Sequence, residues 1–152
     1  MHVVLVEPEI PQNTGSIARS CAATCTPLHL VGKLGFEINE KRIRRAGLDY
    51  WPYVSLKQHA DWNSYLLSVQ PRRIWLFSRF ATKLYYSANF EDGDALVFGS
   101  ETKGLGREFL SEFDPQSILR IPIACPEVRS LNLSNAVSIA LYEARRQLAL
   151  DA

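Results

Sequence analysis

Short apolar runs alternate along the whole chain with stretches in which apolar residues recur at helical spacing. Runs rich in β-branched and aromatic residues predict strands, and apolar positions three and four residues apart predict helices. The predicted strands are His2–Val6, Leu28–Val31, Arg73–Phe77, Ala95–Phe98 and Ser117–Arg120, and the predicted helices are Gly15–Thr24, Glu40–Ala46, Ala60–Ser68, Arg107–Glu112 and Leu133–Leu148. This alternation predicts an α/β fold with a mainly parallel sheet and helices on both faces, in one domain spanning residues 1–152.

The charge of the chain is nearly balanced. It has 17 lysines and arginines against 16 aspartates and glutamates, a formal net charge of +1, which excludes nucleic-acid binding through overall positive charge. One basic run remains, formed by Lys41, Arg42, Arg44 and Arg45. Taken alone, this run fits a solvated helix face better than a phosphate-binding track, and both interpretations stay open.

Neither the cysteines nor the histidines form a recognisable metal or redox motif. The three cysteines are odd in number, and Cys21 and Cys25 have the spacing of one helix face, so free thiols in a reducing cytoplasm are expected. His2, His29 and His59 show no metal-ligand spacing. No apolar stretch approaches the length of a membrane span, and the N-terminus lacks the features of a signal peptide. We therefore expect a cytoplasmic protein with no metal and no membrane partner.

Three loops of unusual composition each follow a predicted strand and precede a predicted helix. They cover residues 7–15, 99–106 and 121–136 and are rich in proline, glycine or small polar side chains. Ligands bind beyond the carboxyl ends of the strands in open α/β sheets, so the three loops are expected to meet in one site. The second loop is no P-loop, because Lys103 precedes Gly104 instead of following it. Tight turning explains its glycines but not Glu101 between them.

Polar residues near two predicted helix starts are further candidates for this site. Asn13 and Thr14 are expected to cap the helix that follows them. Arg19, further along the same helix, fits either a phosphate-binding guanidinium or a surface ion pair with an acid of the preceding loop. The polar residues at the start of the last helix exceed what one cap requires, which indicates a ligand; they are Ser130, Asn132, Ser134 and Asn135.

Taken together, the three loops resemble the motifs of the SPOUT class of S-adenosylmethionine-dependent RNA methyltransferases, specifically the SpoU-type ribose 2′-O-methyltransferases. Motif one corresponds to residues 13–19, motif two to residues 96–105 and motif three to residues 121–136. Residues 7–11, 44–50 and 142–144 extend the resemblance to the minimal tRNA (cytidine/uridine) wobble-position 2′-O-methyltransferases. The resemblance covers essentially the whole chain. Two departures concern turn geometry: Cys25 replaces a common glycine, and Gly106 replaces a frequent proline.

The resemblance implies a C-terminal deep trefoil knot and a homodimer in which the first and last helices meet and the partner completes each active site. It implies S-adenosylmethionine as cofactor and S-adenosylhomocysteine as product. The cofactor contacts would be Phe77, Gly99, Glu101, Ile121, Ser130 and Leu131, and the catalytic positions would be Arg19, Asn13, Glu101, Asn132 and Ser134. RNA would be held by Arg19 and by the basic run Lys41, Arg42, Arg44 and Arg45, which favours the phosphate-binding interpretation of that run.

The implied activity is methyl transfer to the ribose 2′-hydroxyl of the wobble cytidine or uridine of tRNA, with leucine tRNAs as the expected substrates and no role for DNA. Related enzymes are often described with the motif-one arginine as general base. A guanidinium holds its proton, so we expect Arg19 to clamp a phosphate and orient the 2′-hydroxyl instead. Two alternatives stay open: a 2′-O-methyltransferase for another tRNA position or ribosomal RNA, and a non-catalytic knotted RNA-binding protein.

Overall fold

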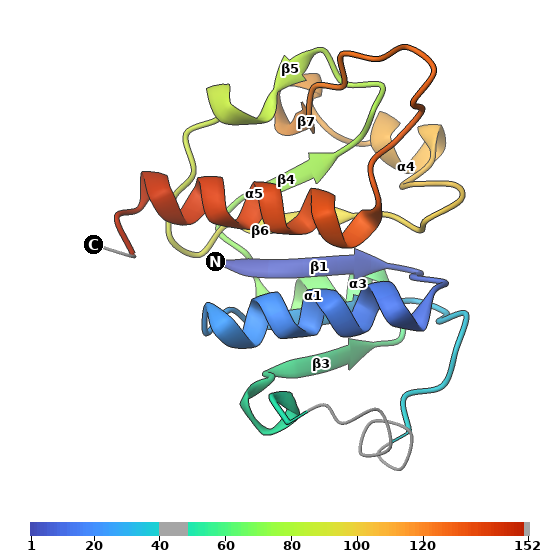
Figure 1. Ribbon diagram of the computed structural model, residues 1–152, viewed down its shortest axis with the longest axis vertical. Coiled ribbons are helices and arrows are strands. Elements are labelled where there is room, and N and C mark those ends of the chain that lie inside the picture. Colours follow the sequence, from blue (N-terminus) through green and yellow to red (C-terminus); the bar gives the residue numbers. More distant parts are fainter. Residues whose placement is uncertain (40–48, 151–152) are drawn as a thin grey trace.

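The computed structural model describes residues 1–39 and 49–150. Within these ranges seven strands form one sheet in the order β3-β2-β1-β6-β4-β7-β5, and every neighbouring pair is parallel (Figure 1). The strands are β1 (His2–Val6), β2 (Leu28–Val31), β3 (Leu56–His59), β4 (Ile74–Phe77), β5 (Lys83–Leu84), β6 (Ala95–Phe98) and β7 (Ile118–Arg120). The α-helices are α1 (Pro11–Ala23), α3 (Trp62–Val69), α4 (Arg107–Ser111) and α5 (Leu133–Gln147), and short 3₁₀ helices span Trp51–Tyr53, Tyr85–Ser87 and Pro115–Ser117.

The predicted α/β class with a parallel sheet is confirmed. Strands β1, β2 and β6 have the predicted bounds, and β4 and β7 each begin one residue later than predicted. The pattern does not predict β3 or β5. β3 pairs only with β2 and exposes its two middle residues, so its sequence is not apolar, and β5 has only two residues. The predicted helix Glu40–Ala46 lies outside the described residues.

Helices cover both faces of the sheet. Figure 1 shows α1 and α5 side by side over one face, where they pack on strand residues such as Val3 and Leu5. Tyr65 of α3 and Leu110 of α4 belong to the core of the other face, with Val4. Successive residues of β1 therefore enter opposite cores, which is why the central strands are continuous apolar runs. None of the described helices is long and apolar enough to cross a membrane.

Helix α1 begins at Pro11 and not at the predicted Gly15. Proline suits the first helical position, because it has no amide hydrogen to leave unbonded there. The carboxylate of Glu101 accepts hydrogen bonds from the two backbone amides just before this proline, at 2.8 and 3.0 Å, and so stabilises the helix start from a distant loop. Asn13 and Thr14 lie inside the helix. Their predicted capping role is wrong.

The turns at the two departures from the family pattern are built differently. Cys25 takes a φ of 50° directly after α1. The amide of Thr26 donates to the carbonyl of Cys21 at 2.9 Å and the amide of Cys25 to that of Ala22 at 3.2 Å, which is a Schellman motif. Cys25 therefore adopts the left-handed backbone conformation that glycine would favour at this position. Gly106 has a φ of 82°, a value that proline cannot adopt, so a proline at this position would require a different backbone conformation.

The three histidines, distant in sequence, lie in a row across β1, β2 and β3. Nδ1 of His29 is 2.9 Å from Nε2 of His59, and Nε2 of His29 is 3.4 Å from Nδ1 of His2. Tyr65 packs edge-on against His29 and His59. Burial, and then the neighbouring imidazoles and Lys57, lower the pKa of His29 to about 4. Among the described residues, no group of His, Cys, Asp and Glu has the geometry to hold a metal ion.

Acidification from pH 7 to pH 4.5 should weaken the fold through His29. The unfolded chain takes up this proton near pH 6.5, whereas the folded chain takes it up near pH 4. The contribution of His29 to the free energy of unfolding is therefore complete above pH 6.5. It falls by on the order of 3 kcal/mol as the pH drops toward 4. Urea unfolding across this range measures the effect. His29→Gln lacks this titration and should show a flatter curve, so equal slopes in both proteins would contradict the assignment.

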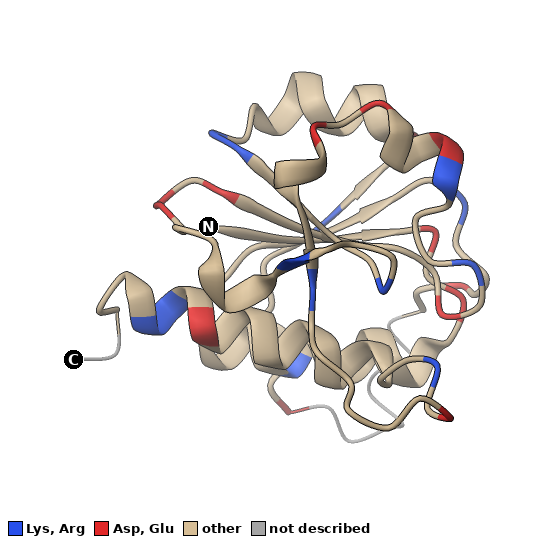
Figure 2. Ribbon diagram, turned by 90° about the horizontal axis from the view of Figure 1, so that it is seen from above, with Lys and Arg blue, Asp and Glu red and all other residues tan. Residues whose placement is uncertain are grey.

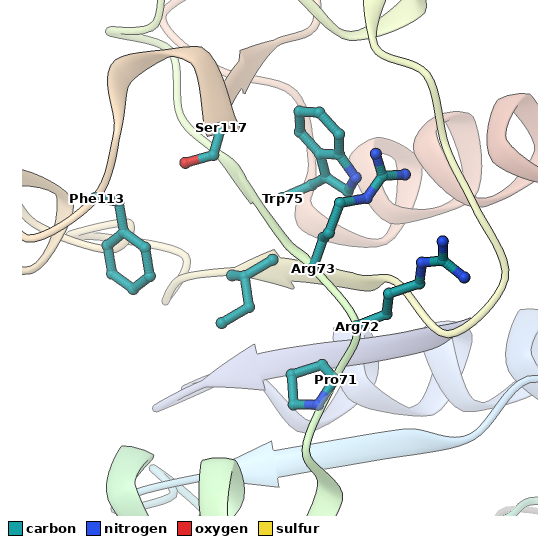
Figure 3. A pocket seen from close by; sticks show the side chains of 7 residues that line it. Pro71, Arg72, Arg73, Trp75, Phe113 and Ser117 are labelled. Carbon is teal, nitrogen blue, oxygen red and sulfur yellow. The ribbon is translucent and has the colours of Figure 1, made fainter.

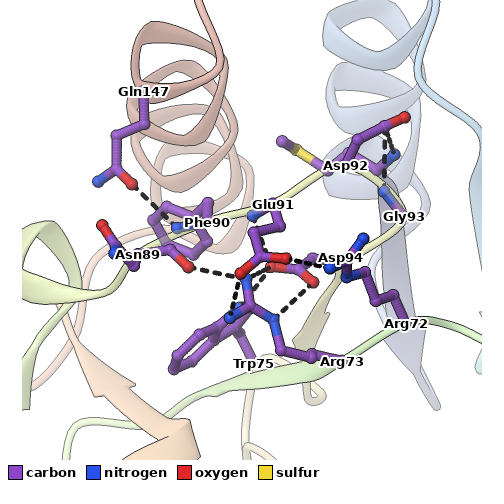
Figure 4. A network of polar contacts seen from close by, with 11 residues as sticks. Arg72, Arg73, Trp75, Asn89, Phe90, Glu91, Asp92, Gly93, Asp94 and Gln147 are labelled. Carbon is purple, nitrogen blue, oxygen red and sulfur yellow. Dashed lines mark hydrogen bonds and ion pairs between the residues drawn. The ribbon is translucent and has the colours of Figure 1, made fainter.

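The buried carboxylate of Asp94, in the loop before β6, binds side chains at the amino-terminal end of β4 (Figure 4). Asp94 is fully buried and accepts hydrogen bonds from Arg73 Nε at 3.0 Å, from Arg73 Nη2 at 2.7 Å and from the indole of Trp75 at 2.8 Å. The backbone amide of Glu91 adds a fourth bond at 2.9 Å. Every donor facing the carboxylate is thus satisfied, and the network stabilises this end of the sheet.

Asp94→Asn should destabilise the protein by about 2–4 kcal/mol, because the amide presents a donor to a guanidinium and removes its counter-charge. The unfolding midpoint in urea measures this. Asp92→Asn is the matched control: this carboxylate lies in the same loop, but its side chain is 92% exposed, and the substitution should leave the midpoint nearly unchanged. Equal midpoints for the two variants would contradict a structural role for the buried network.

Candidate functional site

A pocket of about 570 Å³ opens at the carboxyl ends of β4, β6 and β7. Its walls come from the segment after β4, from the loop after β6 and from the long loop between β7 and α5, with Ile10 and Asn13 closing one side. Because β1 and β4 both lie next to β6 in the sheet, the loops that follow these strands meet at one edge. The three loops singled out in the sequence therefore form one site.

A chain of polar side chains runs along one wall of this pocket. Nδ2 of Asn13 donates to Glu101 at 3.2 Å, and Nδ2 of Asn132 donates to Oδ1 of Asn13 at 3.0 Å. Oδ1 of Asn132 caps α5 by accepting from the amide of Ser134 at 2.9 Å and from its hydroxyl at 2.6 Å. The chain ties the starts of α1 and α5 to the loop after β6, and it fixes the orientation of both amide groups.

The predicted catalytic residues fall into two groups. Asn13, Glu101 and Asn132 line the pocket, whereas Arg19 and Ser134 do not. Arg19 is exposed on α1, with its guanidinium carbon 5.2 Å from the centre of the Tyr50 ring. Among the described residues it forms no ion pair, so the surface ion pair considered from the sequence is not found there. Its guanidinium remains available to a ligand or to another chain.

The ring of Tyr50 lies beneath this arginine. Its hydroxyl donates to the carbonyl of Gly15 at 2.9 Å, which holds the ring against α1. Burial raises the pKa of Tyr50, and the nearby charge of Arg19 opposes that shift. The phenol is therefore a neutral hydrogen-bond donor under the guanidinium.

All six predicted cofactor contacts line the pocket; they are Phe77, Gly99, Glu101, Ile121, Ser130 and Leu131. Their roles remain a prediction, but the fold brings them together. Gly99 is sterically constrained, because a side chain on it would overlap the backbone of Gly104 and Leu105. The predicted RNA-binding run Lys41, Arg42, Arg44 and Arg45 lies outside the described residues.

Sequence reasoning missed part of the pocket wall. Arg79, Phe80 and Arg129 line it together with Lys103, and all four are exposed. The signal available in the sequence was the position of Arg79 and Phe80 directly after a buried strand. With these three cations and, among the described residues, the single carboxylate of Glu101, the pocket wall favours an anionic group on a ligand, such as a carboxylate or a phosphate. Elsewhere in the described residues both signs of charge are interspersed around the periphery (Figure 2).

A second pocket of about 360 Å³ lies at the start of β4, away from the converging loops (Figure 3). Its charged residues are already paired: Arg72 and Arg73 contact Glu91 at 2.7 and 3.1 Å, and Arg73 also binds Asp94. The remaining walls include Trp75 and Phe113. Among the described residues that line this hollow, no free polar groups converge on its interior, so we place the functional site in the larger pocket.

Comparison with known proteins agrees with this geometry. Residues 1–142 match the SpoU rRNA methylase family. The chain belongs to this family. Within it, the tRNA (cytidine(34)-2′-O)-methyltransferase from Saccharophagus degradans is 49% identical over 147 residues, which cover 97% of this chain and 95% of that protein.

Solved structures extend the comparison to the fold. A structure concerned with the 2-OH methylation of C/U34 on tRNA has a TM-score of 0.87 and 47% identity, covering 97% of this chain and 90% of that one. The SpoU methyltransferase AviRb from Streptomyces viridochromogenes, in complex with AdoMet, has a TM-score of 0.80 at 23% identity, covering 98% of this chain and 58% of that one. The latter likeness shows a shared fold.

Proposed function

We propose that this chain transfers a methyl group from S-adenosylmethionine to the ribose 2′-hydroxyl of the wobble cytidine or uridine of tRNA, with leucine tRNAs among its substrates. The observation that carries the proposal is the pocket in which all three motif loops meet beside the Glu101–Asn13–Asn132 chain. The relatives that act on cytidine 34 of tRNA support this target over other RNA positions. A cytoplasmic location and one domain over residues 1–152 belong to the same proposal.

The pocket fits the proposed cofactor. Its volume lies within the range of small-molecule sites, and Phe77, Ile121 and Leu131 offer apolar surface for an adenine ring. The absence of a side chain at Gly99 lets the loop after β6 close against the strand end. When bound, the cofactor supplies the methyl group that the 2′-oxygen accepts, a transfer that requires no metal.

The residues of this chain must align the ribose 2′-oxygen with the methyl group, and the hydroxyl proton would leave to water or to an oxygen of the substrate phosphate. Asn13 and Asn132 are held by hydrogen bonds at the pocket wall, so they can position the 2′-hydroxyl with little loss of conformational entropy. Glu101 accepts three hydrogen bonds from the start of α1, which supports a positioning role for this carboxylate. Ser134 contributes through its bond to Asn132.

A homodimer is part of the proposal. Arg19 does not line the pocket of its own chain, and on α5 the apolar side chains of Ile139 and Tyr142 are 37% and 51% exposed. A partner packed on α1 and α5 would cover these residues and bring its Arg19 to the pocket, where the guanidinium would clamp a substrate phosphate. The trefoil knot is also proposed. It is supported by the path from β7, between β4 and β5, to α5 against α1.

Transfer of labelled methyl from S-adenosylmethionine to tRNA from cells that lack this modification tests the function. Nuclease digestion should place the label on a 2′-O-methylated nucleotide at the wobble position. Label at another tRNA position, or in ribosomal RNA only, would replace the proposed target. Cofactor binding without label in any RNA would favour a non-catalytic RNA-binding protein.

A further inference from the structure

An exposed phenylalanine at the rim of the pocket has two arginines within cation–π distance of its ring. Phe80 is 57% exposed. The guanidinium carbon of Arg79 is 4.7 Å from the centre of its ring, and that of Arg107, at the start of α4, is 5.4 Å away. The amide of Phe80 donates to the hydroxyl of Ser78 at 3.2 Å, so a turn after β4 fixes the backbone at Phe80. Cations from two separate elements thus meet at one aromatic side chain.

This arrangement is unexplained by the packing of the described residues. Phe80 belongs to neither of the two cores. Neither arginine forms an ion pair with any described carboxylate, in contrast to Arg73 and Arg146, which do. An aromatic face and two uncompensated guanidinium groups are therefore presented to solvent, on the same side of the molecule as the pocket wall formed by Lys103 and Arg129.

We propose that Phe80, Arg79 and Arg107 form a stacking platform for a nucleobase of the RNA substrate, next to the nucleotide whose ribose enters the pocket. The inference rests on the proposed function. Unpaired bases of RNA loops stack on aromatic rings, and arginine binds the neighbouring phosphates through its planar fork. Phe80 and Arg79 line the cofactor pocket, so a base stacked on this ring lies directly beside the nucleotide that enters the site. The phenylalanine ring has no polar atoms and contacts only the flat face of a base. It can therefore stack with any of the four bases.

Phe80→Leu tests the platform, because it keeps an apolar side chain of similar reach and removes the π-face. The dissociation constant for tRNA should rise about tenfold, while that for S-adenosylmethionine stays unchanged. Phe80→Trp, with a larger ring, should bind tRNA at least as tightly as the wild type. Tyr86→Leu is the matched control, since Tyr86 is 53% exposed but has no cation over its ring in the described residues. It should leave both constants unchanged.

The charges are tested separately. Replacing Arg79 and Arg107 by glutamine should lower the slope of log Kd for tRNA against log salt by about two, one for each arginine that no longer binds a phosphate. An unchanged slope would remove the phosphate part of the platform.

The outcomes separate this inference from the proposed function. If wild-type protein methylates tRNA and Phe80→Leu binds it equally well, the platform is wrong and the function stands. If Phe80→Leu weakens S-adenosylmethionine instead of tRNA, the ring serves the adenine of the cofactor and the platform is again overturned. If wild-type protein neither binds nor methylates tRNA, the function itself fails, and the platform fails with it.

Discussion

Gly99→Ala is expected to weaken the binding of S-adenosylmethionine severely. Gly99 is buried directly after β6, and a Cβ on it would overlap the backbone of Gly104 and Leu105. This backbone cannot give way without moving the loop over residues 99–106. The same loop carries Glu101, whose carboxylate holds the start of α1 and bonds to Asn13. One methyl group therefore displaces the pocket wall and its polar chain together.

The dissociation constant should rise by at least about 100-fold, the loss typical of a displacement of about 1 Å in a site. Isothermal titration calorimetry measures it, and circular dichroism establishes that the variant is folded. Gly15→Ala is the control, since a Cβ there meets no atom within 4 Å. Gly15 lies inside α1, so alanine should raise stability by about 1 kcal/mol and leave cofactor binding intact. Undiminished cofactor binding by folded Gly99→Ala would place the cofactor elsewhere.

The sequence predicts the centre of this fold better than its edges, and the reason is burial. Strands β1, β2 and β6 are covered by helices on both faces, so almost every residue is apolar and the run is recognisable. β3 at one edge alternates too little to be recognised, and β5 at the other edge is too short. The start of α1 is not predicted correctly for a different reason. The group that stabilises it is Glu101, about ninety residues away in the sequence.

The site shows the same division between local and long-range information. Composition alone singles out the three loops, and parallel strands make their convergence predictable. The Glu101–Asn13–Asn132 chain is not predictable, because it depends on rotamers set by three separate elements. The row of three histidines depends on β3 pairing with β2, a strand that the pattern misses. The role proposed for Phe80 depends on its contact with Arg107 of α4, which is distant in sequence and could not be predicted from it.

Arg19→Lys is expected to lower methyl transfer by about 100-fold while S-adenosylmethionine binds as before. Lysine keeps the positive charge but lacks the planar fork that holds a phosphate through two hydrogen bonds. The exposed guanidinium stands over Tyr50 outside the pocket of its own chain, so the loss should appear with tRNA and not with the cofactor. Single-turnover rates and cofactor titrations separate the two. Near-normal transfer by this variant would contradict the phosphate clamp.

Mixed dimers then decide which pocket Arg19 serves. Arg19→Ala and Gly99→Ala dimers should each be inactive. When the two chains are co-expressed and assemble at random, half of the dimers are mixed. In each mixed dimer, the pocket of the Arg19→Ala chain has an intact Gly99 and can receive the intact Arg19 of the partner chain. Activity should return to roughly a quarter of the wild-type level if the arginine acts across the interface. If it acts within its own chain, every pocket in the mixture lacks one of the two residues and no activity returns. Recovery therefore requires both the dimer and the shared site, because neither alone can produce it.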